Sequence, residues 1–219
     1  MPATVLSGSR ARLLASLLVL PATSASAQQF EEALSVRQGG KEIGREEYTL
    51  HRMGEGRLLL MARAQYPPAN PTLRIGATLQ RTPESIGKFE LDVQGPEGNL
   101  VILAAGSGTR LVVRSVAPGS EAGRELPGGR DVVLLDDRVL SLYVQVADLA
   151  SPAGTRLTAV IPRARRRASF TARREPGDAG ETRIQLSGEI AGTLVLDSGG
   201  RIVRLDLPSA GIAAIRAGK

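Results

Sequence analysis

Few side chains in this sequence could carry out covalent chemistry. The chain has no cysteine and a single histidine, His51, so it offers no thiol nucleophile and only one imidazole as a general base. Ser107 lies between two glycines, but the Gly-x-Ser-x-Gly elbow of serine hydrolases is incomplete around it. The flanking residues predict a turn between strands, where Gly and Ser are common. We therefore interpret His51 as a solvent-facing strand residue and Ser107 as a turn residue.

One segment imitates a catalytic signature. Residues 194–199 read Leu-Val-Leu-Asp-Ser-Gly, the pattern around the catalytic aspartate of aspartic proteases. Such an enzyme needs two aspartates that share one proton, and the pattern occurs once, with little chain after it to complete a half-site. Asp197 to Gly200 also separates two alternating apolar runs, as a hairpin turn does. We favour the turn and predict that the protein is not an enzyme.

Metal and cofactor chemistry has equally little support. Neighbouring carboxylates occur three times, at Glu31-Glu32, Glu46-Glu47 and Asp136-Asp137, without EF-hand spacing. Adjacent residues of a strand point to opposite faces, so such pairs do not converge on an ion. We interpret them as surface charge, except that Asp136 or Asp137 is expected to cap a helix. No glycine-rich stretch ends in Gly-Lys-Ser/Thr, so we predict no metal and no cofactor.

The densest charge is a run of arginines followed closely by Arg173 and Arg174. On one interpretation it binds an anionic lipid head group or an acidic polysaccharide. On the other, which we favour, it is a solvated edge strand whose charge opposes edge-to-edge aggregation. A nucleic-acid partner is disfavoured by a net charge of only +6 and by the absence of tryptophan for base stacking. The residues of the run are Arg163, Arg165, Arg166 and Arg167.

The elements that must position these residues are mostly strands. Leu73 to Leu79 alternates apolar and polar residues, the pattern of a strand with one buried face. Residues 89–93 and 100–103 repeat it around Gly95-Pro96-Glu97-Gly98, which predicts a hairpin. A second hairpin is predicted around Gly39-Gly40, with a bulge at Gly44. Residues 118–129 are predicted to be a turn-rich loop.

One segment favours a helix. Asp136 to Leu149 places apolar residues at helical spacing after an acidic cap, although its alternating leucines and valines leave a strand open as the alternative. With about ten strands and at most one short helix, the sequence predicts a mainly β fold. We expect a curved antiparallel sheet or open half-barrel forming a single domain over residues 28–219.

The first 27 residues read as a secretory signal peptide. Arg10 and Arg12 precede an apolar run, and Ala25-Ser26-Ala27 forms a small-residue cleavage site. The apolar run is shorter than a membrane span, and no later stretch reaches the roughly 20 apolar residues that a span requires. We therefore predict an exported protein without a transmembrane segment, most consistent with the periplasm, with the extracellular space as the alternative.

Both ends of the predicted mature chain resemble those of uncharacterised exported bacterial proteins rich in β structure. The similar segments include Gly39-Gly40-Lys41-Glu42-Ile43-Gly44 near the start and Gly200-Arg201-Ile202-Val203-Arg204-Leu205 near the end. Their architecture is similar, more distantly, to the curved half-barrel of the bacterial lipoprotein-localisation carriers, in which a helix lies over a concave apolar face. The resemblance implies a lipid or acyl-chain ligand but carries over no functional residue.

Two functional hypotheses follow. In the first, an exported envelope protein binds a lipid or other hydrophobic molecule on the concave face of its sheet, and the arginine run meets an anionic head group. In the second, the core is filled and the protein is a structural or protein-interaction module of the envelope with a protein partner. The apolar residues expected to line the ligand site in the first hypothesis are Leu58, Leu60, Leu73, Ile75, Leu79, Phe89 and Leu91.

Overall fold

The computed structural model describes residues 30–67, 71–178 and 180–218, so the predicted signal peptide lies outside the described residues. Within them the chain forms fifteen strands, one short α-helix and three 3-10 helices, of which η1 (Gly54–Gly56) joins β2 to β3 and η3 (Pro208–Ala210) joins β14 to β15. The strands of the first half are β1 (Glu32–Gln38), β2 (Lys41–Met53), β3 (Arg57–Tyr66), β4 (Leu73–Arg81), β5 (Ile86–Gly95), β6 (Gly98–Ser107), β7 (Arg110–Ala117) and β8 (Ser120–Pro127). Those of the second half are β9 (Val132–Leu134), β10 (Thr155–Ile161), β11 (Arg166–Pro176), β12 (Thr182–Gly188), β13 (Gly192–Leu196), β14 (Ile202–Leu207) and β15 (Ile212–Arg216).

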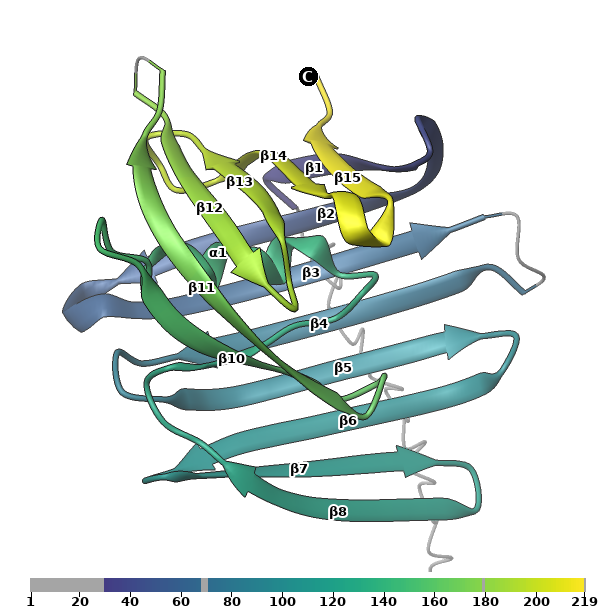
Figure 1. The fold of residues 1–219 in the computed structure, drawn as a ribbon. Helices are drawn as coiled ribbons and strands as arrows, with labels where there is room; N and C mark the ends of the chain where they lie inside the picture. The colour runs from purple at the N-terminus through teal and green to yellow at the C-terminus, as the bar shows by residue number, and fades with distance from the viewer. Residues whose placement is uncertain (1–29, 68–70, 179, 219) are drawn as a thin grey trace, which may run out of the picture.

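All these strands belong to one open, curved sheet. Its order is β8-β7-β6-β5-β4-β3-β2-β1-β15-β14-β13-β12-β11-β10-β9, and only β9 and β10 pair in parallel. The first and last strands join the two halves, with Leu34 opposite Arg216. In Figure 1 the strands β10 to β13 cross in front of the long strands β3 to β6. The mainly β, curved antiparallel architecture is thus confirmed, but the predicted number of about ten strands is wrong.

The undercount has a physical cause at the two ends of the sheet. Strand β8 lies where a turn-rich loop was predicted, and all of its residues except Leu126 are exposed. A strand that buries neither face has no apolar alternation to detect. Strand β9 has only three residues, all of them buried, which is too short a run to be distinguished from a loop. Both are edge strands, and edges are often short or polar.

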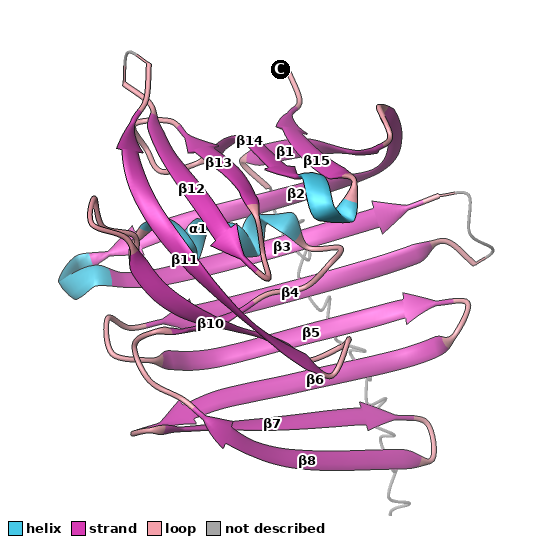
Figure 2. Cartoon of the chain, viewed as in Figure 1, coloured by secondary structure: helices cyan, strands magenta, loops and turns pink. Residues whose placement is uncertain are grey.

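The interior of the curved sheet holds the segment between β9 and β10. The 3-10 helix η2 (Leu140–Tyr143) continues into α1 (Val144–Ala147), and every residue of both is buried. Helix η2 contacts β2, and α1 contacts β11 on the other half of the sheet. Figure 2 shows this cyan segment behind β11 and β12. The helical interpretation of residues 136–149 is therefore confirmed in a shorter form, and the strand alternative is wrong.

The N-terminus of this helical segment is capped by Glu46 of β2. Its carboxylate accepts hydrogen bonds from the backbone N–H groups of Leu140 at 2.7 Å and Ser141 at 2.9 Å. The predicted cap by Asp136 or Asp137 is wrong, because Asp136 accepts from the Arg138 N–H and binds Arg163 instead. The surface assignment of Glu46 is also wrong, since it is fully buried. A carboxylate from a neighbouring strand satisfies the free N–H groups of a helix start as well as a local cap does.

The predicted turns agree with the structure. Gly95 pairs with Gly98 at the β5–β6 hairpin, and the β1–β2 hairpin has its register shift between Val36 and Arg37, opposite Gly44. A Cβ added to Gly44 would lie 2.4 Å from the Tyr66 ring. Glycine is therefore required there because the aromatic ring approaches the backbone.

The arginine run lies on the β10–β11 hairpin. Both of its strands are internal, since β9 flanks β10 and β12 flanks β11. The interpretation of this run as an edge strand is therefore wrong. Among the described residues, no helix is long and apolar enough to cross a membrane.

Candidate functional site

The apolar residues predicted to line a ligand site form part of one continuous core. Leu58, Leu60, Leu79, Phe89 and Leu91 are at most 1 % exposed and belong to the same buried cluster as the helical segment 140–147. Their side chains alternate with exposed or partly exposed residues along β3, β4 and β5, so all of them face the concave side. The sequence prediction of their shared face is confirmed, and the protein's own segment packs against that face.

A pocket of about 440 Å³ opens where this concave face reaches the end of the strands. Most of its lining residues belong to β5, β6 and the turn between them, which is on the right in Figure 1, and Arg163 of the β10–β11 hairpin also lines it. Of the residues predicted to bind a ligand, Leu73 and Arg163 meet here, although ninety residues of chain separate them. The other lining residues are Val93, Gly95, Pro96, Glu97, Gly98, Asn99, Leu100 and Ala117.

The arginine of this pocket is fixed by a buried carboxylate. Arg163 Nε lies 2.8 Å from Asp136 Oδ2 and its Nη2 lies 2.8 Å from Oδ1, and the Asp136 side chain is 0 % exposed. Burial by itself would lower the pKa of Arg163, but the hydrogen bonds and charge of Asp136 outweigh burial and raise it. The guanidinium is therefore a permanent cation that its bidentate bond to Asp136 holds in one orientation.

The other three arginines of the run lie differently. Arg166 pairs with Asp137 at 3.4 Å on the surface, and Arg165 occupies a left-handed turn position with φ of 53°. Arg167 is exposed. Of the four arginines that the sequence analysis proposed for an anionic head group, only Arg163 lines the apolar pocket.

A buried polar cluster lies behind the pocket. The Tyr66 hydroxyl donates to the Arg138 carbonyl oxygen at 2.7 Å, and the Arg138 guanidinium stands 5.0 Å from the centre of the Tyr66 ring. Burial raises the pKa of Tyr66, and it raises the pKa of Glu46 to about 7. Such a carboxyl group is suited to proton transfer, but Glu46 is fully buried and bonded to the helix. We interpret the cluster as the support that positions Arg163 and the internal helix.

The residues considered for catalysis lie on a strand and at two turns. His51 is exposed on β2, and Ser107 ends β6 at the turn into β7. Asp197 Oδ1 accepts from the N–H groups of Gly199 and Arg201, both at 2.9 Å, while its Oδ2 binds Arg216 at 2.8 Å. The hairpin interpretation of the protease-like segment is confirmed. No group of three or more potential metal ligands occurs among the residues that the structure describes.

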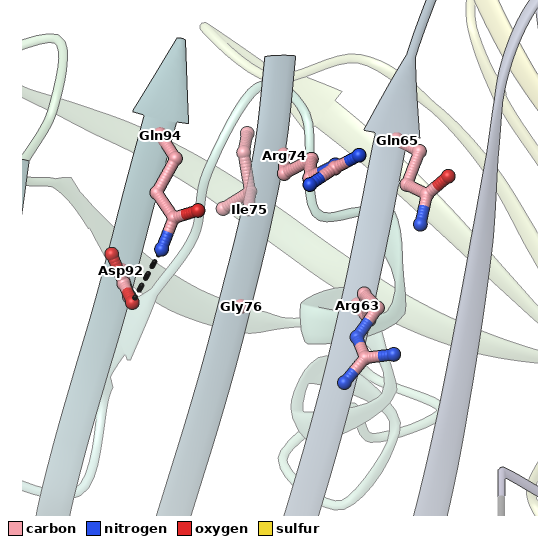
Figure 3. Close-up of a pocket in the computed structure, with 7 residues that line it drawn as sticks. All are labelled: Arg63, Gln65, Arg74, Ile75, Gly76, Asp92 and Gln94. Carbon is pink, nitrogen blue, oxygen red and sulfur yellow. Dashed lines mark hydrogen bonds between the residues drawn. The ribbon is translucent and has the colours of Figure 1, made fainter. Parts of the chain in front are cut away.

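A second, polar groove of about 500 Å³ lies on the outer face of β3, β4 and β5. Gly76 leaves an open space at its centre, and Gln94 bonds Asp92 at 3.4 Å (Figure 3). Ile75, one of the predicted ligand residues, borders this groove, but its side chain is buried. The polar side chains of the groove are exposed, so it lacks the apolar lining expected of a lipid site. They are Arg63, Gln65, Arg74, Asp92 and Gln94.

The chain has few detectable similarities to known proteins. No family model matches this chain, and no curated protein matches it. A solved structure to which the chain shows some similarity is the crystal structure of a DUF1089 family protein from Pseudomonas aeruginosa. It is 12 % identical, its TM-score is 0.42, and the match covers 75 % of this chain and 90 % of that chain. At this level of similarity we assign neither a family nor a function, and the comparisons do not show the resemblance to lipoprotein-localisation carriers.

Proposed function

We propose that this protein is a non-enzymatic, exported envelope protein that binds an amphipathic, lipid-like molecule in the apolar pocket at the β5–β6 end of its sheet. The observation that carries the proposal is the meeting of Leu73, Leu100 and Arg163 around one opening. The volume of about 440 Å³ lies within the range of small-molecule sites. A pocket with an apolar wall and one fixed guanidinium donor, whose charge Asp136 balances, suits a ligand with a hydrocarbon part and a polar end that accepts a hydrogen bond.

Binding would use burial for affinity and Arg163 for orientation. The hydrocarbon part would lie against Leu73, Val93 and Leu100, which gains roughly 25 cal/mol for each Å² of apolar surface removed from water. Arg163 Nη1 would donate to the polar end. Because Asp136 already holds the guanidinium, little side-chain entropy would be lost on binding.

Native mass spectrometry of the protein purified from its own cells tests the proposal, with organic extraction to identify any bound molecule. We expect a near-stoichiometric excess mass that resolves into one amphipathic class. Refilling with a fluorescent fatty acid should be weakened about tenfold or more by Leu100→Gln, because a polar group would enter the apolar wall. Val112→Gln is the matched control, since Val112 is 47 % exposed and lies outside the pocket. A clean apo mass with no uptake of the fatty acid would overturn the proposal.

The alternative function, a structural or protein-interaction module of the envelope with no ligand, has one observation in its favour. The concave face is occupied by the protein's own helical segment, and residues such as Leu60 and Phe89 are 0 % exposed. A protein partner cross-linked in cells, together with an empty apolar pocket, would support this alternative.

A further inference from the structure

A pocket of about 320 Å³ lies at the opposite end of the strands from the apolar pocket, on the left in Figure 1. It forms where the β2–β3 and β4–β5 turns meet the chain on either side of the internal helix. Five arginines line it with a single carboxylate, that of Asp148. The arginines come from separate parts of the chain, and they are Arg52, Arg57, Arg81, Arg130 and Arg174. We call it the arginine pocket.

Neutral acceptors hold two of these arginines in place. Arg81 is only 4 % exposed, and it donates to the carbonyl oxygens of Val132, at 2.7 Å, and Arg130. Arg174 Nη2 donates to the carbonyl oxygen of Ala147 at 2.5 Å. Carbonyl oxygens orient a guanidinium without cancelling its charge.

Carboxylates neutralise only a small part of this charge. Asp148 binds Arg52, and Glu55 lies 4.0 Å from Arg57 on the surface. Among the described residues, Arg81, Arg130 and Arg174 take part in no ion pair. Burial lowers the pKa of Arg81 to about 10, although the negative charges of Asp148 and Asp131 act in the opposite direction. Like charges held this close favour the binding of an anion, since each cation raises the potential at the others.

We propose that the arginine pocket binds a phosphate group, as a phosphomonoester or a pyrophosphate. The fork of a guanidinium matches two phosphate oxygens, and a group carrying about two negative charges complements several arginines better than a single carboxylate does. The volume admits a pyrophosphate-sized group. The site is distinct from the proposed lipid pocket and stands or falls independently of it.

Asp148 sets the strength of this site in the proposal. Its carboxylate shares the wall with the arginines and engages Arg52, so an incoming anion competes with it. Removing its charge without changing its shape should strengthen anion binding. This inverse effect separates a specific pocket from general attraction to a basic protein.

Isothermal titration of the full chain with sodium pyrophosphate at low salt tests the proposal. We expect saturable binding that weakens about tenfold in Arg130→Gln and in Arg174→Gln, because each variant removes a charge-assisted hydrogen bond. Asp148→Asn should bind about threefold more tightly, and added salt should weaken binding by screening. Arg183→Gln is the matched control, because Arg183 is exposed on β12 and lies outside the pocket.

A second arm distinguishes the source of the phosphate. Vesicles of phosphatidylcholine with and without phosphatidic acid are offered to the same variants. Pocket-dependent vesicle binding without pyrophosphate binding would assign the phosphate to a membrane lipid. Pyrophosphate binding without pocket-dependent vesicle binding would assign it to a soluble molecule. The proposal is overturned if neither probe binds in a pocket-dependent way, or if Arg183→Gln weakens binding as much as Arg130→Gln.

Discussion

Near the two ends of strand β4, a buried and a partly buried arginine are held by different kinds of hydrogen-bond acceptor. Leu73 begins the strand at the apolar pocket and Arg81 ends it at the arginine pocket, roughly 26 Å away at about 3.3 Å per residue. At the apolar end, Arg163 is bonded to the carboxylate of Asp136. At the other end, Arg81 is bonded to backbone carbonyl oxygens.

In the two proposals, this difference in acceptor decides which kind of molecule each end binds. A carboxylate cancels the charge of its arginine, which leaves a surface that favours apolar molecules with one polar contact. A carbonyl group fixes the arginine and leaves its charge, which leaves a surface that favours anions. The fold thus separates the apolar pocket from the arginine pocket along a single sheet.

The largest effect should come from breaking the carboxylate pairing at the apolar end. Asp136→Asn would leave Arg163 partly buried without its counter-charge, so we expect a loss of about 3 kcal/mol in the free energy of unfolding. Urea denaturation followed by circular dichroism measures it. Asp137→Asn is the control, since Asp137 is half exposed and its loss should cost under about 1 kcal/mol. Equal losses in the two variants would contradict the role of burial.

Glu46 should make the stability of the protein depend on pH between about 4.5 and 7. Its pKa is raised by burial to about 7 from 4.5, so the folded state binds a proton more tightly than the unfolded state. The free energy of unfolding should therefore fall by roughly 3 kcal/mol for this group as the pH rises from about 4.5 to 7, and it should stay level at higher pH. Glu46→Gln has no such titration.

The check is to compare urea midpoints for the wild type and Glu46→Gln at pH 4.5 and pH 8. Relative to the urea midpoint of the wild type, the midpoint of Glu46→Gln should be higher at pH 8 than at pH 4.5. A difference that does not change with pH would mean that Glu46 ionises in the folded protein as it does in the unfolded chain.

The sequence predicted those parts of this comparison that depend on periodicity. Alternation from Leu73 to Leu79 predicted β4 and its inward face, and both Leu73 and Arg163 were named as ligand residues. The same alternation could have predicted that Glu46 is buried, since Tyr48 and Leu50 follow it at strand spacing and both point inward. The adjacent Glu47 suggested a surface pair instead.

The arginine pocket could not be predicted in this way. Its cations come from segments that are far apart in the chain, and the curvature of the sheet brings them together. Of these cations, Arg174 was noted in the sequence because it closely follows the arginine run, and the structure places the run and Arg174 toward opposite ends of β11. Strand β8 was missed for a related reason, because pairing with β7 defines it and its exposed side chains do not.

A smaller effect should follow from changing how Arg81 is held. Lysine keeps the positive charge but cannot bond two carbonyl oxygens in the fixed geometry of a guanidinium. In Arg81→Lys one of the carbonyl groups of Val132 and Arg130 would lose its partner, so we expect a loss of about 1–2 kcal/mol with pyrophosphate binding largely kept. Thermal unfolding with and without pyrophosphate separates the two effects. A variant as stable as the wild type would show that the carbonyl bonds contribute little.

The smallest effect is expected for the ion pair between Asp137 and Arg166, which is on the same hairpin as Arg163. This pair differs from the pair between Asp136 and Arg163 mainly in burial. Arg166 and Asp137 are each about half exposed and lie 3.4 Å apart. A double-mutant cycle with Arg166→Gln and Asp137→Asn should give a coupling energy of at most about 0.5 kcal/mol, decreasing further at high salt. A coupling as large as that of Arg163 with Asp136 would show that the hairpin itself, and not burial, strengthens both pairs. The contrast between the two ends of the sheet would then need another explanation. That contrast assumes that the groups around each arginine decide whether its charge is neutralised.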